Sequence, residues 1–347
     1  MSAAAPPLCP ACGAPHAAGD RFCADCGARL GGPPVPACPN CGGTGFDADG
    51  FCTDCGARSR GSAAGLVVLG PGLAAITDPG RQHRENQDAV ELSGPLEGGV
   101  GVVAVVCDGV SHSQTPAAAA SVAAQAAAAA LRAAEDVALG ATGIRVSAVA
   151  MRDAVVAAHA AVCALPYDRQ ADVDPPACTL VAACVQRDGN GLAVVLGWLG
   201  DSRAYLVVDG GAVLLTHDHS WVNQVVDAGT MPLADALRDR RAHALVNCLG
   251  TTDFSAPSPC PEPSVRTVSV PASDLRGPGW LLLCTDGLWN YANSPAALLR
   301  ACPGLRGMEA GAFCSALLQH ALDGGGHDNV TVAVVRLAVG SGGAFVP

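Results

Sequence analysis

The sequence has few aromatic and few charged residues. Of its 347 residues, 4% are aromatic and 15% are charged, whereas 50% are hydrophobic, and alanine, glycine and valine supply much of the apolar content. Most of the chain can therefore bury a core, and its length allows roughly two domains.

Positive charge is also scarce. The chain has 20 Lys and Arg against 31 Asp and Glu, a net charge of −11, and no basic run is longer than Arg240-Arg241. Because phosphate contacts need clustered Lys and Arg, a nucleic acid is not expected as a partner. The acidic surplus can instead reflect carboxylates that hold cations.

Targeting and membrane signals are lacking as well. The N-terminus has no basic region of the kind that opens a signal peptide. The alanine-rich stretch Ala117–Ala134 contains Gln125 and Arg132, and a spanning segment needs about 20 strongly apolar residues. We therefore expect a soluble helix there, no membrane association and a cytoplasmic location.

Cysteine is abundant, and its distribution is uneven. The count of 17 is odd, which argues against a fully paired disulfide framework. Eight cysteines form four C-x-x-C pairs near the N-terminus. Others, such as Cys107, Cys184 and Cys284, lie in apolar runs, where a free thiol behaves as a small hydrophobic group. This usage favours a reducing compartment.

The N-terminal cysteines belong to an internal repeat at residues 9–26 and 38–55. Each copy has a Phe before its third Cys and ends in Asp-Cys-Gly-Ala-Arg. Two C-x-x-C turns can complete a tetrahedral zinc site, and units this short need a metal to fold. Disulfides or a redox pair are the alternatives, but exact duplication of a four-cysteine unit favours zinc. The expected Zn²⁺ ligands are Cys9, Cys12, Cys23, Cys26, Cys38, Cys41, Cys52 and Cys55.

These units resemble the double zinc ribbon found beside many enzymatic domains, here at residues 1–56. Four thiolates fill each site, so we expect the two zinc ions to be structural and the ribbons to bind a protein partner or regulate the rest of the chain. Only Arg21, Arg29 and Arg58 supply positive charge up to residue 58, too few for a surface that follows a nucleic-acid backbone.

Beyond a linker at residues 57–72, short valine-rich runs and longer helical patterns come in blocks rather than in strict alternation. This arrangement favours an α+β layered fold, with a flexible tail at residues 339–347. The expected strands are Val100–Cys107, Cys178–Val185, Leu192–Leu199, Ala204–Val208, Trp280–Cys284 and Val330–Leu337. The expected helices are Ala117–Ala134, Val146–Ala164 and Met308–Leu322.

Aspartates adjoin the apolar strands at five places, namely Asp88, Asp108, Asp201, Asp286 and Asp328. Taken singly, an Asp-Gly such as Asp108-Gly109 is as readily a turn as a functional site. Five carboxylates beside core strands, however, are costly to bury unless cations hold them. Oxygen ligands indicate Mg²⁺ or Mn²⁺. Two such ions form a site at which an activated water attacks phosphorus in line.

The ordered motifs over residues 73–338 resemble the PP2C (PPM) family of metal-dependent serine/threonine protein phosphatases, with the bacterial pattern. They are Gly80–Asp88, Val105–Gly109, Gly200–Arg203, Asp218–Ser220, Thr285–Trp289 and His327–Thr331. The resemblance implies a four-layer α-β-β-α sandwich and a phosphoserine/phosphothreonine hydrolase. The substrates would be phosphoproteins made by a Ser/Thr kinase.

The resemblance also implies residue roles. Asp88, Asp108, Asp286 and Asp328 would be the catalytic carboxylates and metal ligands, and the Gly109 carbonyl would join them. A third, weaker metal would be held by Asp201. Thr179 and Asn329 would be framework residues.

Three positions depart from the family pattern. His83 stands where many members have the arginine that binds the substrate phosphate, so Arg81 or Arg84 would take that part. Gln87 replaces the usual Glu. Val110 follows Asp108-Gly109 where eukaryotic members carry a histidine, and His112 is expected to have a surface or packing role rather than to donate a proton.

The alternative to an active phosphatase is a zinc-ribbon adaptor on a catalytically inactive phosphatase fold, which would bind phosphoproteins without turnover. Such a fold should lose one or more of the five aspartates. None is lost, and this favours activity.

Overall fold

A computed structural model describes residues 65–94, 101–138, 146–189, 191–208, 211–250, 260–275 and 277–338, together with Pro15 and Thr53. The chain divides into two compact units, Met1–Gly61 and Ser62–Pro347. All helices and strands named below belong to the second unit. The eight predicted zinc ligands and the predicted tail at residues 339–347 lie outside the described residues.

One antiparallel sheet has six strands in the order β1-β2-β13-β12-β8-β9. Its two central strands, β12 and β13, are almost wholly buried, which explains why they read as continuous apolar runs instead of alternating patterns. The strands are β1 (Gly65–Gly70), β2 (Leu73–Asp78), β8 (Arg203–Val208), β9 (Gly211–Leu214), β12 (Gly279–Cys284) and β13 (Val330–Leu337).

The other main sheet has five strands in the order β11-β7-β6-β4-β3. They are β3 (Asp88–Ser93), β4 (Val102–Asp108), β6 (Leu180–Asp188), β7 (Gly191–Leu199) and β11 (Ser264–Val270). The predicted strand Cys178–Val185 is interrupted at Thr179. Residues before the break form β5 (Ala177–Cys178), which pairs with β10 (Leu249–Gly250) instead.

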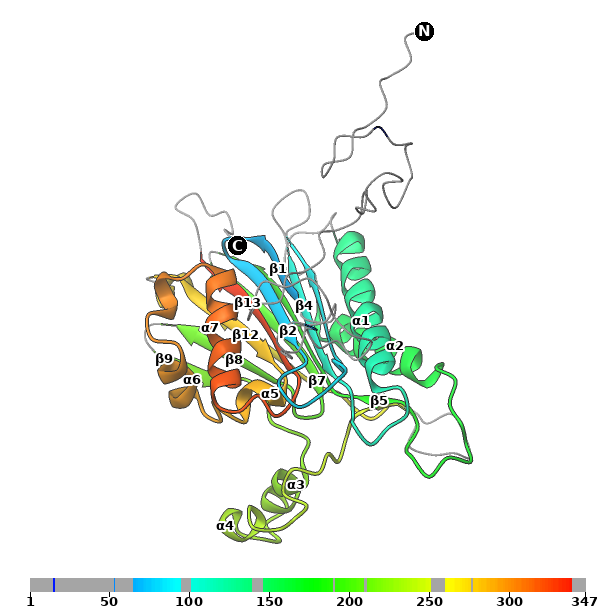
Figure 1. Ribbon diagram of the computed structural model, residues 1–347. Helices are drawn as coiled ribbons and strands as arrows, with labels where there is room; N and C mark the ends of the chain where they lie inside the picture. The colour runs from blue at the N-terminus through cyan, green and yellow to red at the C-terminus, as the bar shows by residue number, and fades with distance from the viewer. Residues whose placement is uncertain are drawn as a thin grey trace. The chain divides into compact units, whose positions relative to one another are not determined.

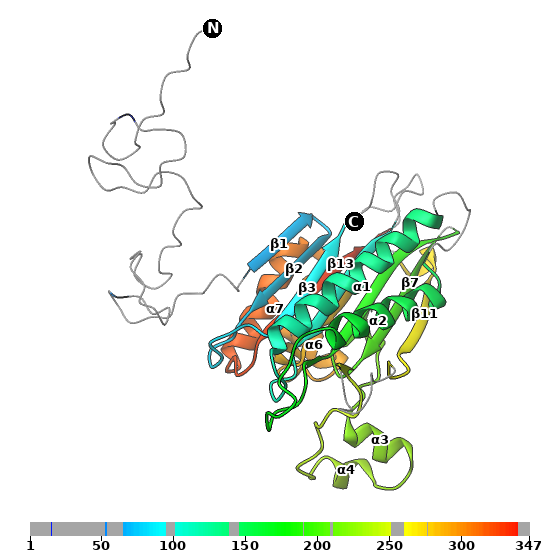
Figure 2. The same ribbon diagram turned by 90° about the vertical axis from the view of Figure 1, so that its right-hand side faces the viewer.

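Helices cover the outer face of each sheet (Figures 1 and 2). The pair α1 and α2 packs on the five-stranded sheet, with Leu131, Met151 and Val155 fully buried in that layer. On the six-stranded sheet, α5, α6 and α7 pack through Leu288, Leu298 and Phe313, respectively. The helices are α1 (Pro116–Ala138), α2 (Ala148–Cys163), α5 (Asp286–Trp289), α6 (Pro295–Ala301) and α7 (Ala310–Asp323), with 3-10 turns at Ala272–Asp274 and Leu305–Gly307.

The inner faces of the two sheets meet in a core of their own. Val106, Leu196 and Val335 are among its buried members, contributed by β4, β7 and β13. The molecule therefore has the four layers α-β-β-α that the sequence predicted.

Helix α1 is long and apolar enough, over Pro116–Ala134, to meet the length and composition of a membrane span. Its side chains nevertheless pack inward, and Ala120, Ala124 and Leu131 are almost completely buried. Because this face lies against the sheet and α2, α1 is a core helix of the layered fold.

The predicted linker at residues 57–72 contains a strand. β1 pairs antiparallel with β2, from Gly65 opposite Thr77 to Gly70 opposite Leu73. Its side chains Leu66–Leu69 remain about half exposed. Because β1 is little buried, its sequence lacks the alternation of apolar and polar residues that marks a half-buried strand. The predicted linker therefore includes β1 together with the Gly/Ser-rich sequence before it.

A segment of residues 217–248, here the α3–α4 segment, protrudes from one end of the sandwich (Figure 1). It contains α3 (Trp221–Asp227) and α4 (Leu233–Ala236). Its own small cluster consists of Val222, Ala236 and Ala242, with partly buried neighbours.

Candidate metal centre at one edge of the two sheets

Antiparallel pairing brings the aspartates to one edge of the sandwich. Asp88 at the start of β3 lies directly opposite Asp108 at the end of β4. In the other sheet, β12 and β13 are also antiparallel neighbours, so Asp286 after β12 and Asp328 before β13 share an edge. Asp201 follows β7 and is buried.

The carboxylates raise one another's pKa values, as expected of like charges that lie close together. Burial first, and the charges of Asp286 and Asp328 after it, raise the pKa of Asp88 to about 7. Burial and then the charge of Asp328 raise the pKa of Asp286 to about 6. For Asp108, burial followed by the charges of Asp88 and Asp286 raises the pKa well above its ordinary value.

Asp201 joins the same electrostatic group. Burial, followed by the charges of Asp286 and Asp218, raises the pKa of Asp201 to about 8. The Asp201 charge in turn contributes to the raised pKa of Asp108. All five predicted carboxylates are therefore brought together at this edge, and without a counter-charge they repel one another.

The oxygens that this edge leaves unsatisfied fit divalent cations. Asp88 Oδ1 and Asp286 Oδ1 are buried and have no hydrogen-bond partner in the described structure. Buried carboxylate oxygens without donors are expensive unless a cation binds them. No three His, Cys, Asp or Glu side chains in the described ranges enclose an ion by themselves. Water would therefore complete the coordination, as is usual for Mg²⁺.

A buried row of hydroxyl groups orients Asp88, and sequence reasoning missed its role. Thr285 Oγ1 donates to Asp88 Oδ2 over 2.9 Å, and it accepts the Thr331 backbone N–H over 3.0 Å. The Thr331 and Thr77 hydroxyls lie 2.7 Å apart, and Asn86 Nδ2 donates to Thr77 Oγ1. The position of Thr285 directly before Asp286 was the available sequence signal for this role. The sequence did not show its partners, because they lie on other strands.

Asn329 ties the loops around the edge together, as its predicted framework role requires. Its side-chain oxygen accepts the Gln87 N–H over 2.7 Å, and its amide nitrogen donates to the carbonyls of Pro79 and Glu85. Gln87 O in turn accepts the Gly109 N–H over 3.0 Å. Gly109 is thereby fixed beside Asp108.

Thr179 supports the same loop from the opposite side, also as predicted. Its backbone N–H donates to Asp108 O over 2.8 Å, and its hydroxyl accepts the Asp108 N–H over 3.3 Å. The Thr179 and Ser202 hydroxyls lie 2.7 Å apart. The break between β5 and β6 therefore links Asp108 to the turn that carries Asp201.

Close backbone approach explains the glycine after Asp286. A Cβ at Gly287 would overlap the carbonyl oxygen of Asn329. Gly287 therefore allows the start of α5 to lie directly against the loop that carries Asp328.

The two arginines predicted to bind phosphate differ in their surroundings. Arg81 points to Asp323, with 3.9 Å between Nη2 and Oδ1, and its backbone N–H donates to Gly326 O. Arg84 is exposed and has no hydrogen bond or ion pair to another described residue. His83 Nε2 lies 3.5 Å from Asp328 Oδ1.

Arg203 forms a second framework beside the edge. It makes a bidentate ion pair with Asp218, with 2.7 Å between Nη2 and Oδ2 and 3.0 Å between Nε and Oδ1. Its guanidinium carbon lies 3.8 Å from the centre of the Trp289 ring, and Trp289 Nε1 donates to Asp201 O over 2.9 Å. The indole therefore joins Arg203 to Asp201. This arrangement was not predicted.

The histidines near Asp218 have structural partners. His219 Nδ1 accepts the Gly200 N–H over 3.2 Å, and its ring stacks on Trp198. His217 Nε2 pairs with Asp227 Oδ2 over 2.7 Å. These contacts agree with the structural role expected for both.

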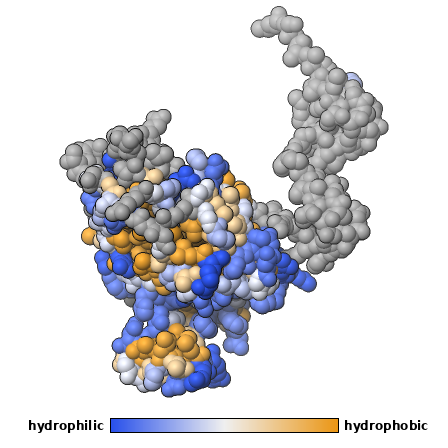
Figure 3. All heavy atoms as spheres, turned by 90° about the vertical axis from the view of Figure 1, so that its left-hand side faces the viewer, coloured by the Kyte–Doolittle hydropathy of each residue, from blue (hydrophilic) through white to orange (hydrophobic). Residues whose placement is uncertain are grey.

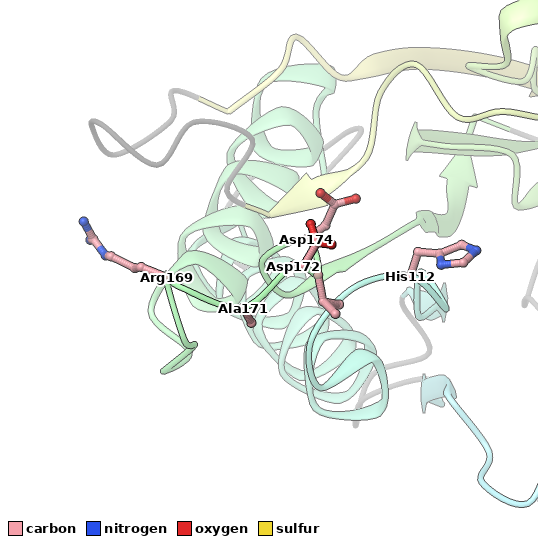
Figure 4. Close-up of a pocket in the computed structure, with 6 residues that line it drawn as sticks. His112, Arg169, Ala171, Asp172 and Asp174 are labelled. Atoms are coloured by element: carbon pink, nitrogen blue, oxygen red, sulfur yellow. The ribbon is translucent and has the colours of Figure 1, made fainter.

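His112 is exposed and lines a pocket of about 500 Å³ together with Arg169, Asp172 and Asp174 (Figure 4). In this view the two carboxylates lie side by side, whereas the imidazole belongs to the turn after β4 and points away from them. Its exposure agrees with the expected surface role.

Sequence profiles of known families match both parts of the chain. The profile of protein phosphatase 2C matches residues 80–310. The chain belongs to the protein phosphatase 2C family. The profile of the double zinc ribbon domain matches residues 1–56, which agrees with the predicted repeat.

The relatives of this family member are bacterial phosphatases. The serine/threonine phosphatase stp of Listeria welshimeri is 29% identical over 171 residues, which cover 49% of this chain and 60% of the relative. PstP of Mycobacterium tuberculosis is 31% identical over 146 residues, 42% of this chain and 25% of the relative. The chain thus spans at most about 60% of the length of these curated relatives.

Solved structures show the same fold. The M. tuberculosis phosphatase PstP/Ppp has a TM-score of 0.56 at 27% identity and covers 77% of this chain and 98% of that structure. The catalytic domain of PstP, solved in complex with two manganese ions, has a TM-score of 0.54 at 27% identity, with coverages of 76% and 97%. The four-layer architecture is confirmed.

Proposed function

We propose that the chain is a Mn²⁺- or Mg²⁺-dependent phosphatase that hydrolyses phosphoserine and phosphothreonine in proteins. The observation that carries this proposal is the edge at which five aspartates meet. Burial and mutual repulsion raise the pKa values of Asp88, Asp108, Asp201 and Asp286, and buried oxygens of Asp88 and Asp286 have no donor in the described structure. Manganese in the related catalytic domain of PstP supports it.

In this proposal, Asp88, Asp108, Asp286 and Asp328 hold two ions together with the Gly109 carbonyl. Asp201 holds a third. When bound, the ions neutralise phosphoryl charge and activate a water for in-line attack. The chain itself contributes orientation: Thr285 fixes the Asp88 carboxylate, and Asn329 and Thr179 fix the loops on which the ligands lie.

Arg84 is the better placed of the two arginines to receive the substrate phosphate. Arg81 already faces Asp323, whereas Arg84 is exposed and unpaired in the described structure. Substituting Arg84 by Ala should raise KM by about ten-fold or more, the effect of losing a hydrogen bond to a charged group. Arg81→Ala should change KM less, and Arg300→Ala, which removes another exposed arginine on α6, is the control. An Arg84→Ala enzyme with unchanged KM would exclude this assignment.

The proposed substrates are phosphoproteins made by a Ser/Thr kinase, in a cytoplasmic setting, and the zinc ribbons would bind a protein partner. A phosphoprotein-binding adaptor without turnover is the alternative. It is disfavoured because all five carboxylates are retained.

The test is hydrolysis of a phosphothreonine peptide by the full chain with Mn²⁺, Mg²⁺ or EDTA. We expect turnover that requires the metal and is lost in Asp108→Asn and Asp286→Asn. Asp274→Asn, the same change at an exposed position, should retain it. A folded, Mn²⁺-loaded chain that hydrolyses neither phosphopeptides nor p-nitrophenyl phosphate would favour the adaptor.

A further inference from the structure

A cavity of about 240 Å³ lies between the α3–α4 segment and the carboxylate edge. Asp201 and Trp289 form its wall on the side of the edge, and Leu233, Leu237 and Val222 line it from the α3–α4 segment. Asp201 belongs to both the cavity wall and the group of five aspartates, so the cavity borders the carboxylate edge.

Two apolar side chains of this wall, Leu233 and Leu237, lie outside the cluster that holds the α3–α4 segment together. Ala236 is fully buried in the cluster with Val222 and Ala242. Leu233 and Leu237 are not part of that cluster, and they remain 52% and 53% exposed. They lie one helical turn apart, and the Leu237 N–H donates to Leu233 O over 2.9 Å. Both therefore share one face of α4. Figure 3 shows apolar surface on this protruding part of the molecule.

The charged side chains of the wall are already engaged. Asp218 is paired bidentately with Arg203, and His217 with Asp227. Asp201 is assigned to a cation by the proposed function. The other titratable side chain that lines this cavity, among the described residues, is His243, whose ring lies 6.5 Å from that of Trp289. An apolar group in the cavity would cover exposed leucine surface.

One polar group on the wall lacks a partner. Ser220 is 4% exposed, and its hydroxyl makes no hydrogen bond in the described structure. A buried hydroxyl without a partner is unfavourable. A peptide backbone offers both an N–H and a carbonyl at each residue, the two kinds of group with which a serine hydroxyl can pair.

We propose that this cavity recognises an apolar, aliphatic side chain of the phosphoprotein substrate, close in sequence to the phosphorylated residue. Leu233 and Leu237 form the contact surface, and the stacked Arg203–Trp289 pair is a rigid wall. The volume suits one side chain, since it is below the roughly 300–1,000 Å³ of pockets for drug-sized ligands. The inference rests on the proposed phosphatase function and adds a substrate preference to it.

The test compares phosphothreonine peptides that differ at a single flanking position, which carries Leu, Ser, Lys or Glu in turn. With the Mn²⁺-loaded full chain, we expect Leu to raise kcat/KM over Ser by about ten-fold at one or two positions, the factor for burying one such side chain. This higher kcat/KM should come from a lower KM, with kcat unchanged.

Two variants locate the preference. Leu233→Ser and Leu237→Ser should each reduce the ratio of kcat/KM between the Leu and Ser peptides several-fold, and Leu237→Met should retain most of it. The matched control is Leu66→Ser, which changes a leucine of similar exposure (47%) on β1, and its ratio should equal that of the unmodified chain. A ratio between two peptides does not depend on the active fraction of a variant.

Three results would overturn the inference: equal rates for all flanking residues, a preference for Lys or Glu, or a Leu preference that survives both serine variants. Hydrolysis of p-nitrophenyl phosphate separates these outcomes from failure of the proposed function. Metal-dependent hydrolysis without discrimination refutes the recognition cavity alone, whereas a chain with no hydrolysis at all refutes both.

Discussion

The carboxylate edge and the α3–α4 segment share a boundary at Asp201 and Trp289, yet they are held by different means. Around the edge, the ligand loops are tied by side-chain hydrogen bonds that cross between strands, as from Thr285 to Asp88 and from Asn329 to Glu85. The α3–α4 segment has helices of seven and four residues, and its own cluster contains three buried apolar side chains, Val222, Ala236 and Ala242.

Under the proposed function, this difference separates a region for chemistry from a region for substrate recognition. Catalytic ligands need fixed positions, so the fold accepts repulsion between buried carboxylates and opposes it with many hydrogen bonds. A surface that receives a substrate can be less stable, and low local stability is typical of binding segments. Substitutions at the edge should therefore change activity strongly, whereas substitutions in the α3–α4 segment should change local opening.

The largest effect is expected for Asp88→Asn. Activity on a phosphothreonine peptide should fall by more than about a hundred-fold, since loss of groups that merely support a metal ligand already costs 10–100-fold. The melting temperature in EDTA should instead rise, because the change removes one charge from a repelling cluster. A variant with lower stability in both EDTA and Mn²⁺ would show that Asp88 is structural.

The metal-free protein should lose stability as pH rises. The folded-state pKa values of Asp88, Asp201 and Asp286 are raised to about 7, 8 and 6. Between about pH 4 and 8 the folded state therefore binds more protons than the unfolded state, so the free energy of unfolding falls with pH. We expect this decrease to be measurable by urea titration in EDTA. Saturating Mn²⁺ should abolish the trend, and a flat profile in EDTA would contradict it.

Thr285→Val should have an intermediate effect. It leaves Asp88 Oδ2 and the Thr331 N–H without their partner, and should lower the free energy of unfolding by about 1–3 kcal/mol. It should also weaken Mn²⁺ binding about ten-fold. Thr230→Val is the matched control, since the Thr230 hydroxyl bonds only to Val225 O at an exposed position of the α3–α4 segment. Equal losses in the two variants would remove the proposed contrast between the regions.

The smallest global effect is expected for Val222→Ala. It removes apolar contacts from the small cluster and should weaken amide protection in residues 217–248 by about ten-fold, a local change of roughly 1 kcal/mol. The melting temperature should hardly change. Val332→Ala, the same truncation in the buried strand β13, should lower it clearly. A matching fall for Val222→Ala would mean that the segment unfolds together with the sandwich.

The amino-acid sequence alone predicted the layered α+β fold and the position of the five aspartates at strand ends. It also contained the ordered motifs that place the chain in its family. Those features follow from local patterns, because apolar runs mark buried strands and a charged residue at their ends marks an exposed or functional edge. The expected helices also match α1, α2 and α7 within a few residues.

The side chains that support the site are identified only in the three-dimensional structure. Thr285 and Asp88 are separated by 197 positions, and Arg203 at the start of β8 contacts Trp289 at the end of α5. The structure also shows that Arg81 faces Asp323 and that β1 belongs to the six-stranded sheet. It shows further that Leu233 and Leu237 line a cavity beside Asp201. The physical reason is that hydrogen-bond and ion-pair partners depend on how strands are ordered and layered, whereas periodicity in the sequence records only whether each element is buried.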